Sequence, residues 1–294
     1  ATALSFLVIL AWLFLFPPEV AEQETTATTE TTQEVAPAAE GTTPAAPEIA
    51  EAEAARITIQ TPRLTGTLSL QGARIDDLAL NDYRVSLEPG ADLVHLLNPV
   101  GEPFAYYAVH GWSGANLPEG SLPGPETVWT LAEGEVLTPE TPVTLTWESA
   151  AGLTFVRTVS VDADYMFTIA DSVTNAGEQD VTLQPYGFIA RHGRPDTPSN
   201  WILHEGVVRM SDGILDLIPY GDLPDLDRAA DNSQTDEETV TANGWTGFTD
   251  KYWMTTLVPT PGTGFRSTVR YIPETGIFQT FAWMPETQIA AGAT

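Results

Sequence analysis

The chain has 294 residues, with 12 Lys and Arg against 40 Asp and Glu, which gives a formal net charge of −28 at pH 7. A polyanion of this density repels nucleic-acid phosphates, so we predict no nucleic-acid partner. The chain contains no Cys. That excludes a disulfide framework, a thiolate nucleophile and a lipid-modified cysteine.

The chain opens with an apolar run, Ala1 to Phe16, that carries no charge. As a helix it would span roughly 24 Å, against about 30 Å for the hydrocarbon core of a bilayer. Because the sequence starts without Met, we expect a few preceding residues and predict an N-terminally incomplete transmembrane signal anchor at residues 1–16, in contact with the lipid bilayer. A cleaved signal peptide and a buried helix of a soluble protein are the alternatives. The Pro-Pro-Glu sequence that follows fits cleavage poorly.

Residues 17–55 contain nine Glu and no Lys or Arg, and most of the remainder is Thr, Ala and Pro. This composition cannot bury enough apolar surface to offset the entropy lost on ordering, so we predict a disordered acidic linker. A segment without cations is easily moved across a membrane. We therefore place the rest of the chain on the outer side.

Short runs of Val, Ile, Leu, Thr and aromatic residues alternate with Gly, Pro, Asn and Asp clusters over residues 56–294. The period of two, clearest at residues 143–147, predicts strands, and no long window has the period of a helix. We predict one all-β domain of two large packed antiparallel sheets, with one or two short helices between Asp216 and Glu238. Arg157 interrupts an otherwise apolar strand face. Further strands are expected at residues 153–161, 165–169, 181–183, 187–190, 201–203, 252–258, 265–271 and 277–283.

The sequence carries little that indicates catalysis. The four histidines, His95, His110, His192 and His204, lack the spacing of zinc ligands, and there is neither a Gly-x-Ser-x-Gly elbow nor a phosphate-binding Gly-rich loop. We predict no enzymatic activity, no metal and no cofactor. The alternative is a sugar-binding or aldose-epimerase-like module, which needs a His and a carboxylate in one cleft. His192, His204 and Glu205 are the candidates for that role.

The segment 244–254 concentrates large aromatic side chains around Lys251, the one lysine of the chain. Trp and Tyr dominate binding hot spots, which indicates a protein-partner surface. The other interpretation, which we favour, is a strand pair that buries the aromatics while Lys251 pairs with a nearby carboxylate. The candidate partner surface comprises Arg191, His192, His204, Glu205, Trp245, Phe248, Lys251, Tyr252 and Trp253.

Five stretches are specific in both residue and spacing: 61–84 (TPRLTGTLSLQGARIDDLALNDYR), 152–177, 191–193, 203–206 and 244–254. Together with the N-terminal apolar run and the acidic linker, they resemble the YidC-type membrane protein insertases of α-proteobacteria. The resemblance implies a periplasmic β-supersandwich similar in fold to galactose mutarotase. It also implies an inner-membrane location with the main domain in the periplasm. The implied role is to insert and fold inner-membrane proteins, alone or with the Sec translocon, without nucleotide or covalent chemistry.

The resemblance further implies five membrane helices after the β domain, which enclose a hydrophilic groove. This sequence reaches Thr294 without a second apolar run. We therefore expect a longer protein, in which the insertase helices and the contacts with nascent membrane proteins lie outside this chain. The part present here is expected to tether, to stabilise the assembly and to dock to periplasmic parts of Sec accessory subunits. An unrelated membrane-tethered adhesin is a further alternative.

Overall fold

A computed structural model describes residues 55–195 and 204–294, which form twenty β-strands and one short 3-10 helix. The all-β prediction is confirmed for these residues. The predictions for the apolar run at 1–16, for the linker up to residue 54 and for a strand at 201–203 lie outside the described ranges. Within those ranges, no helix is long and apolar enough to cross a bilayer.

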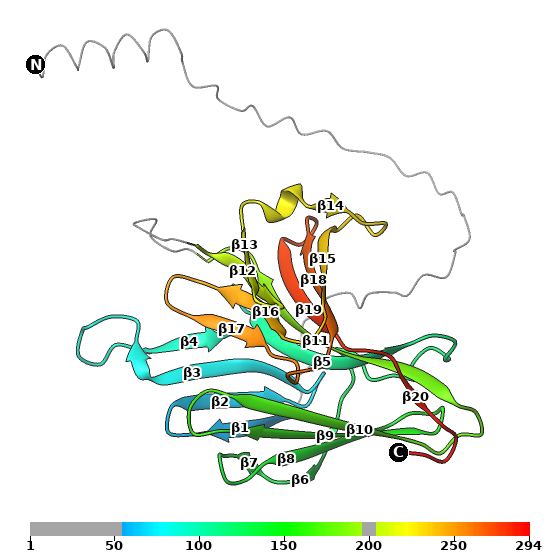
Figure 1. The fold of residues 1–294 in the computed structure, drawn as a ribbon. Helices are drawn as coiled ribbons and strands as arrows, with labels where there is room; N and C mark the ends of the chain where they lie inside the picture. The colour runs from blue at the N-terminus through cyan, green and yellow to red at the C-terminus, as the bar shows by residue number, and fades with distance from the viewer. Residues whose placement is uncertain (1–54, 196–203) are drawn as a thin grey trace, which may run out of the picture. The chain divides into compact units, whose positions relative to one another are not determined.

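One large sheet of twelve strands organises the domain (Figure 1). In sheet order it contains β14 (Asp227–Arg228), β15 (Gln234–Val240), β18 (Phe265–Ile272), β19 (Ile277–Trp283), β11 (Val181–His192), β5 (Tyr106–Gly114), β3 (Arg74–Arg84), β2 (Leu64–Ser69), β1 (Arg56–Gln60) and β7 (Val136–Leu137). Outside this path, β20 (Thr287–Ile289) pairs with β11 and β4 (Leu93–Leu97) pairs with β3. Among the strand pairs of the described ranges, β1 with β7 is parallel and the others are antiparallel.

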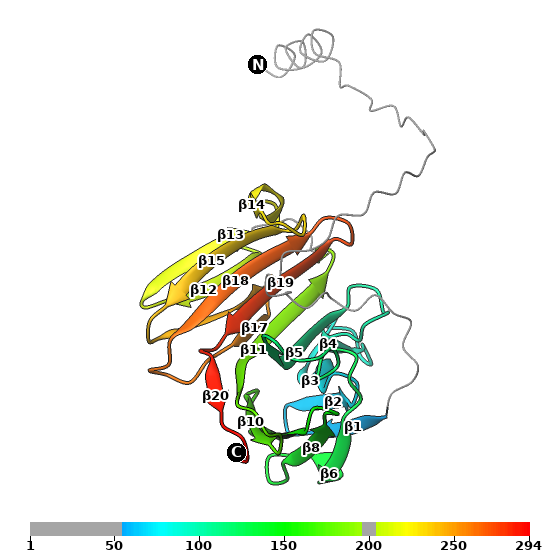
Figure 2. The same ribbon diagram turned by 90° about the vertical axis from the view of Figure 1, so that its right-hand side faces the viewer.

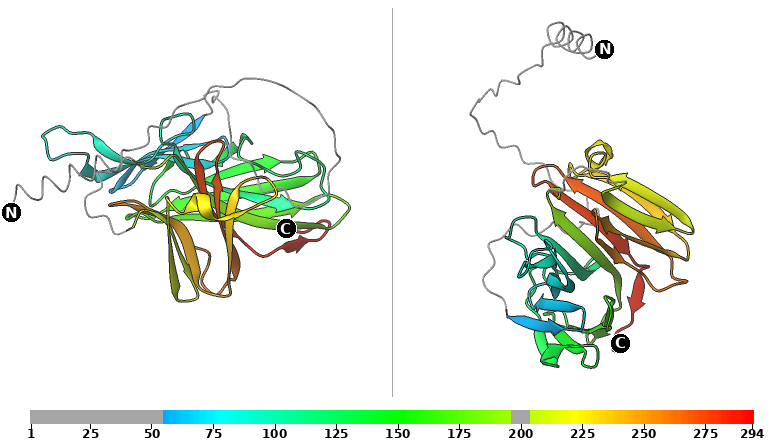
Figure 3. Two further views of the ribbon diagram at one scale, coloured as in Figure 1. Left: turned by 90° about the horizontal axis from the view of Figure 1, so that it is seen from above. Right: turned by 90° about the vertical axis from the view of Figure 1, so that its left-hand side faces the viewer.

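Two four-stranded sheets accompany the large sheet. The β9 sheet has the order β10 (Phe167–Asn175), β9 (Leu153–Val161), β8 (Val143–Glu148) and β6 (Thr130–Glu133). The β16 sheet has the order β13 (Ile214–Pro219), β12 (Gly206–Ser211), β16 (Gly244–Thr249) and β17 (Met254–Leu257). The domain therefore has one large and two small sheets, where the sequence predicted two large ones. Figures 2 and 3 show their arrangement from other sides.

Several strands coincide with their sequence predictions. Strand β19 spans the predicted residues, β18 extends one residue further, and the two pieces expected at 181–183 and 187–190 are parts of β11. Residues 165 and 166 instead precede β10, because the Asp162 carboxylate accepts hydrogen bonds from the backbone N–H groups of Asp164 and Met166 and forms a turn. The predicted acidic loop contains the 3-10 helix η1 (Leu223–Asp225), but strands occupy much of the rest.

Strand β9 shows why an alternating sequence pattern predicts a strand. Its buried face holds Leu153, Phe155, Arg157, Val159 and Val161, while the residues between them are partly exposed. Side chains of a strand alternate between two faces, so an arginine in this series must enter the core with its neighbours. Arg157 is 1% exposed and therefore needs partners inside the protein.

Those partners join the β9 sheet to the large sheet. Arg157 Nε and Nη2 donate to the two carboxylate oxygens of Asp171 at 2.8 and 2.7 Å, and Nη1 donates to the His110 carbonyl at 2.8 Å. Trp112 Nε1 donates to Asp171 Oδ2 at 3.2 Å, and the Arg157 guanidinium lies 4.9 Å from the centre of the Trp129 ring. We call these five residues the interior clamp. Asp171 comes from β10, and His110 and Trp112 come from β5, so the clamp crosses between sheets.

Candidate functional site

The structure divides the nine candidate residues by burial. Phe248 is 0% exposed and lies against Tyr220 and Tyr106, with ring centroids 5.9 and 6.4 Å away. It belongs to the core and cannot contact a partner, which corrects its place in the candidate surface. Phe248 shares its face of strand β16 with Thr246, two residues earlier, which is also fully buried.

Trp245 lies at the other end of strand β16 from Lys251, Tyr252 and Trp253. It pairs with Met210 of β12, whereas Thr249, the last residue of β16, pairs with Gly206. Met210 pairs in turn with Leu215 of β13. Residues directly opposite in an antiparallel sheet share a face. Trp245, Met210 and Leu215 therefore form a row across the sheet, which we call the Trp245 row; Leu215 is exposed, and the other two are half-buried.

Arg191 and the segment after β16 are brought together over a long stretch of sequence. Arg191 Nη1 lies 2.9 Å from Asp250 Oδ2, and its guanidinium lies 4.5 Å from the centre of the Tyr106 ring. The Tyr220 hydroxyl donates to Asp250 Oδ1 at 3.2 Å. We call Arg191, Asp250, Tyr106 and Tyr220 the hairpin clamp, because it ties the β16–β17 hairpin to the large sheet.

The remaining candidates hold the backbone around this clamp. Glu205 Oε1 accepts the backbone N–H of Lys251 at 3.0 Å, and the Lys251 ammonium lies 5.2 Å from the centre of the Tyr252 ring. His204 Nε2 lies 2.9 Å from the Val207 carbonyl, to which it can only donate. His192 Nε2 lies 3.3 Å from the Tyr107 hydroxyl, and burial lowers its pKa. These contacts hold the local backbone and side chains in place.

The electrostatics of the hairpin clamp follow from its burial. Burial raises the pKa of Asp250, against the opposing effects of Arg191 and the Tyr220 hydroxyl. Burial also raises the pKa values of Tyr106 and Tyr220, so both phenols stay neutral. The two neutral phenols, the guanidinium and the carboxylate contact one another and so hold the backbone at residue 250 in place.

The clamped hairpin carries exposed apolar side chains. Tyr252 is 72% and Met254 50% exposed, and Trp253 between them contacts Tyr83 of strand β3 edge-on, with ring centroids 4.7 Å apart. The loop from β3 to β4 continues this surface. We call the combined surface the exposed rim, made of Tyr83, Val85, Leu87, Tyr252 and Met254. Figure 1 shows the β3–β4 and β16–β17 hairpins projecting on the same side.

The β3–β4 half of the exposed rim was not predicted from the sequence. Tyr83, Val85 and Leu87 alternate with Arg84 and Ser86 just before a Glu-Pro-Gly turn. That pattern indicates a strand end with one apolar face. It does not indicate whether the face is covered, and in the described structure the three side chains are exposed.

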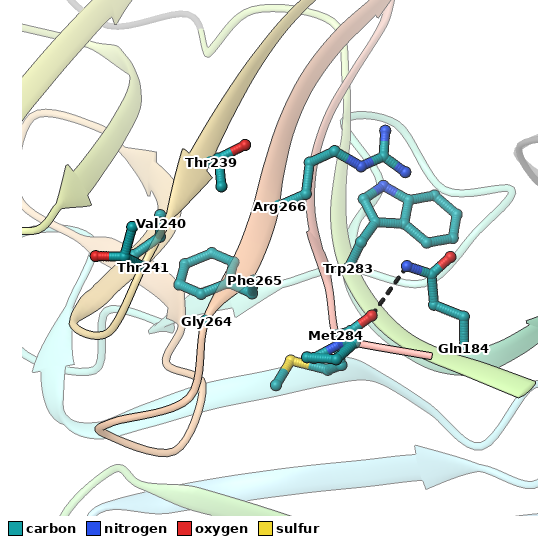
Figure 4. Close-up of a pocket in the computed structure, with 10 residues that line it drawn as sticks. Gln184, Thr239, Val240, Thr241, Gly264, Phe265, Arg266, Trp283 and Met284 are labelled. Carbon is teal, nitrogen blue, oxygen red and sulfur yellow. Dashed lines mark hydrogen bonds between the residues drawn. The ribbon is translucent and has the colours of Figure 1, made fainter. Parts of the chain in front are cut away.

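A shallow hollow of about 440 Å³ lies on the large sheet beside β18 and β19 (Figure 4). The Arg266 guanidinium lies 5.4 Å from the centre of the Trp283 ring and pairs with Glu237, and Gln184 Nε2 donates to the Met284 carbonyl at 2.9 Å. Neither a His nor a carboxylate is among the described residues that line it. The hollow therefore lacks the acid and base that the epimerase-like alternative requires.

Comparisons with known proteins place this geometry in a family. Residues 56–294 match the family model described as the YidC periplasmic domain. Three proteins named "Membrane protein insertase YidC" are close relatives. The protein of Dinoroseobacter shibae is 47% identical, and the match covers 92% of this chain and 47% of the relative. The protein of Cereibacter sphaeroides is 46% identical, over 100% of this chain and 48% of the relative. The protein of Ruegeria pomeroyi is 47% identical, over 92% of this chain and 48% of the relative. The chain thus spans about half the length of the curated relatives it matches.

Among solved structures, the Slr1438 protein of Synechocystis sp. PCC 6803 aligns with 82% of this chain and 92% of its own. The identity is 8% and the TM-score 0.42, too low to support any argument. The sequence matches decide the assignment: with a family model that covers most of its length, the chain belongs to the YidC family, and residues 56–294 form its YidC periplasmic domain.

Proposed function

We propose that this chain is the anchor and periplasmic part of a membrane protein insertase, which inserts and folds inner-membrane proteins. The observation that carries the proposal is the match of residues 56–294 to the YidC periplasmic domain, together with relatives about 45% identical that are named as insertases. In this proposal residues 1–16 form a transmembrane span that anchors the chain in the inner membrane. Residues 17–55 are the linker, and residues 56–294 lie in the periplasm.

The β domain is proposed to act as a rigid scaffold and to bind protein partners. Three mostly antiparallel sheets, joined by buried Arg–Asp pairs, support a role as a rigid scaffold. The fold we propose for the domain is a supersandwich of the galactose-mutarotase type. Nascent membrane proteins would engage parts of the protein beyond this chain. The Sec translocon and its accessory subunits are the proposed periplasmic partners.

An insertion assay tests the main proposal. Cells depleted of their own insertase would express the complete gene that encodes this chain, and protease protection would report whether a short inner-membrane protein is inserted. We expect insertion to be restored. The same gene without the codons for residues 1–16 is the control for the anchor. A full-length protein that accumulates normally in the membrane and does not restore insertion would overturn the proposal.

For the Sec partnership, the Trp245 row is the surface we propose. Trp is enriched among hot-spot residues, and the row gives it apolar neighbours on an outward sheet face. Trp245→Ala should reduce co-purification of Sec subunits with the full-length protein. Tyr252→Ala, at the opposite end of the β16 sheet, is the matched control and should leave it unchanged. Equal capture by the folded Trp245→Ala variant would exclude this surface.

A further inference from the structure

The β3–β4 hairpin presents apolar side chains that nothing in the described structure covers. Tyr83, Val85 and Leu87 are 44%, 66% and 106% exposed, so exposure increases toward the tip. Gly90 in the following turn has φ +84°, and a Cβ added there would meet no atom within 4 Å. The tip therefore stands clear of the domain, as the view from above in Figure 3 also shows.

The second hairpin extends this surface and is held rigidly beside the first. The edge-on contact between Tyr83 and Trp253 joins them, and the hairpin clamp fixes Asp250 at the base of the β16–β17 turn. Two loops that are distant in the sequence thus meet at the Tyr83–Trp253 contact and bring exposed apolar side chains to one side of the domain. Exposed apolar side chains that gather in this way mark an interaction site.

The chemistry of the exposed rim fits a bilayer interface better than a protein pocket. Tyr and Trp favour the boundary between lipid and water, where Lys and Arg side chains reach the headgroups. Next to the two tyrosines of the rim lie the exposed Arg84 and the half-buried Lys251. Hot spots of protein interfaces are packed inside pockets surrounded by a seal of other residues. Leu87 instead stands fully exposed at a projecting tip, the position from which an aliphatic side chain can enter the headgroup region.

We propose that the exposed rim rests on the interfacial layer of a zwitterionic phospholipid bilayer. This inference depends on the proposed anchor and linker. The proposed flexible linker of residues 17–55 would have an end-to-end distance of roughly 35 Å. A tether of that reach would keep the local concentration of bilayer high, so that even a weak contact is populated. Because the chain carries a net charge of −28, attraction to anionic headgroups does not contribute, and the contact depends on apolar and aromatic groups.

The absence of cysteine allows a direct test. Leu87→Cys in the full chain gives a single thiol for an environment-sensitive fluorophore. The labelled chain would be reconstituted in phosphatidylcholine liposomes that contain a lipid with a nitroxide on its headgroup. Ile214→Cys is the matched control. Ile214 is 72% exposed at the β12–β13 turn, where its partner Ser211 pairs with Gly244, at the opposite end of the β16 sheet from the rim. We expect quenching several-fold stronger at residue 87 than at residue 214.

Two further measurements separate the explanations. In the Leu87→Cys chain, the added substitutions Tyr83→Ser and Tyr252→Ser should reduce quenching several-fold with an unchanged circular dichroism spectrum, and anionic lipid should not increase it. Equal quenching at residues 87 and 214 in liposomes that float with the chain would overturn the rim contact while leaving the anchor intact. Protection of the residue 87 label only after Sec subunits are added would overturn it in favour of a protein partner. A chain that does not float overturns both proposals, since neither segment then holds lipid.

Discussion

The interior clamp and the hairpin clamp use the same chemistry in different surroundings. Each sets an arginine against an aromatic ring, pairs it with an aspartate and connects a four-stranded sheet to the large sheet. Arg157 makes two hydrogen bonds to Asp171 and a third to a carbonyl. Arg191 Nε, by contrast, has no hydrogen-bond partner among the described residues.

This difference indicates what each clamp does for the protein. A buried ion pair whose polar atoms are all satisfied holds its elements in one arrangement, and breaking it leaves an uncompensated buried charge. The hairpin clamp is less completely satisfied, and the pKa of Asp250 is raised by its burial. We interpret the interior clamp as part of the domain's stability and the hairpin clamp as a support for the exposed rim. Four predictions test this distinction.

The largest effect is expected from Arg157→Met. The substitution leaves the Asp171 carboxylate without its bidentate partner, and the expected loss in the free energy of unfolding is about 3–5 kcal/mol. Urea unfolding followed by tryptophan fluorescence measures it. The double variant Arg157→Met with Asp171→Leu should recover part of the loss, because no unpaired charge remains. A single variant as stable as the parent would show that the clamp is not structural.

The second prediction concerns pH and His110, whose carbonyl belongs to the interior clamp. Burial, together with the nearby Arg157 charge, lowers the pKa of His110 from 6.5 to about 4. The unfolded chain takes up a proton below pH 6.5 and the folded chain does not, so the folded state loses stability as the pH falls from 6.5 toward 4. The loss amounts to as much as about 3 kcal/mol. The free energy of unfolding, measured with urea across this pH interval, should fall more steeply for the parent than for His110→Gln. Parallel curves would contradict the assignment.

Arg191→Gln should have a smaller and more local effect. One charged hydrogen bond is lost, at a cost of about 1.5–3 kcal/mol. Hydrogen exchange of the backbone amides at residues 250–254 should accelerate more than that of β9. The comparison is Arg157→Lys, which keeps the charge in the interior clamp. It should not accelerate exchange selectively at residues 250–254. Uniform acceleration across the domain in Arg191→Gln would remove the distinction between the clamps.

The smallest effect is expected for Asp250→Asn. Its test is the direction in which the stability difference between parent and variant changes with pH. Because the folded-state pKa of Asp250 is raised above 3.8, the folded state binds this proton more tightly than the unfolded chain. The parent therefore loses stability relative to the variant as the pH rises through the carboxyl range, and the penalty of the substitution shrinks.

For Asp212 the pH dependence has the opposite sign, since the Thr241 hydroxyl and three backbone N–H groups lower the pKa of this carboxyl. The penalty of Asp212→Asn should grow with pH in the same unfolding series.

The sequence alone determined the class of the domain and the position of many strands. A period of two follows from backbone geometry within a few residues, so β8 and β19 could be read directly from their own side chains. Family membership could be recognised in the same way, because the matching stretches are local strings of residues. The same local reading placed Arg157 on the face that is buried, but not its partner.

Only the tertiary structure decided how these strands assemble into one large and two small sheets, and which side chains meet. Asp250 reaches Arg191, and Trp253 reaches Tyr83, across long stretches of chain that no local pattern relates. Strand order and register set such contacts, and both depend on the collective packing of the sheets. For the same reason burial divided segment 244–254, with Phe248 in the core and Tyr252 in water, although both are aromatic residues in one short run.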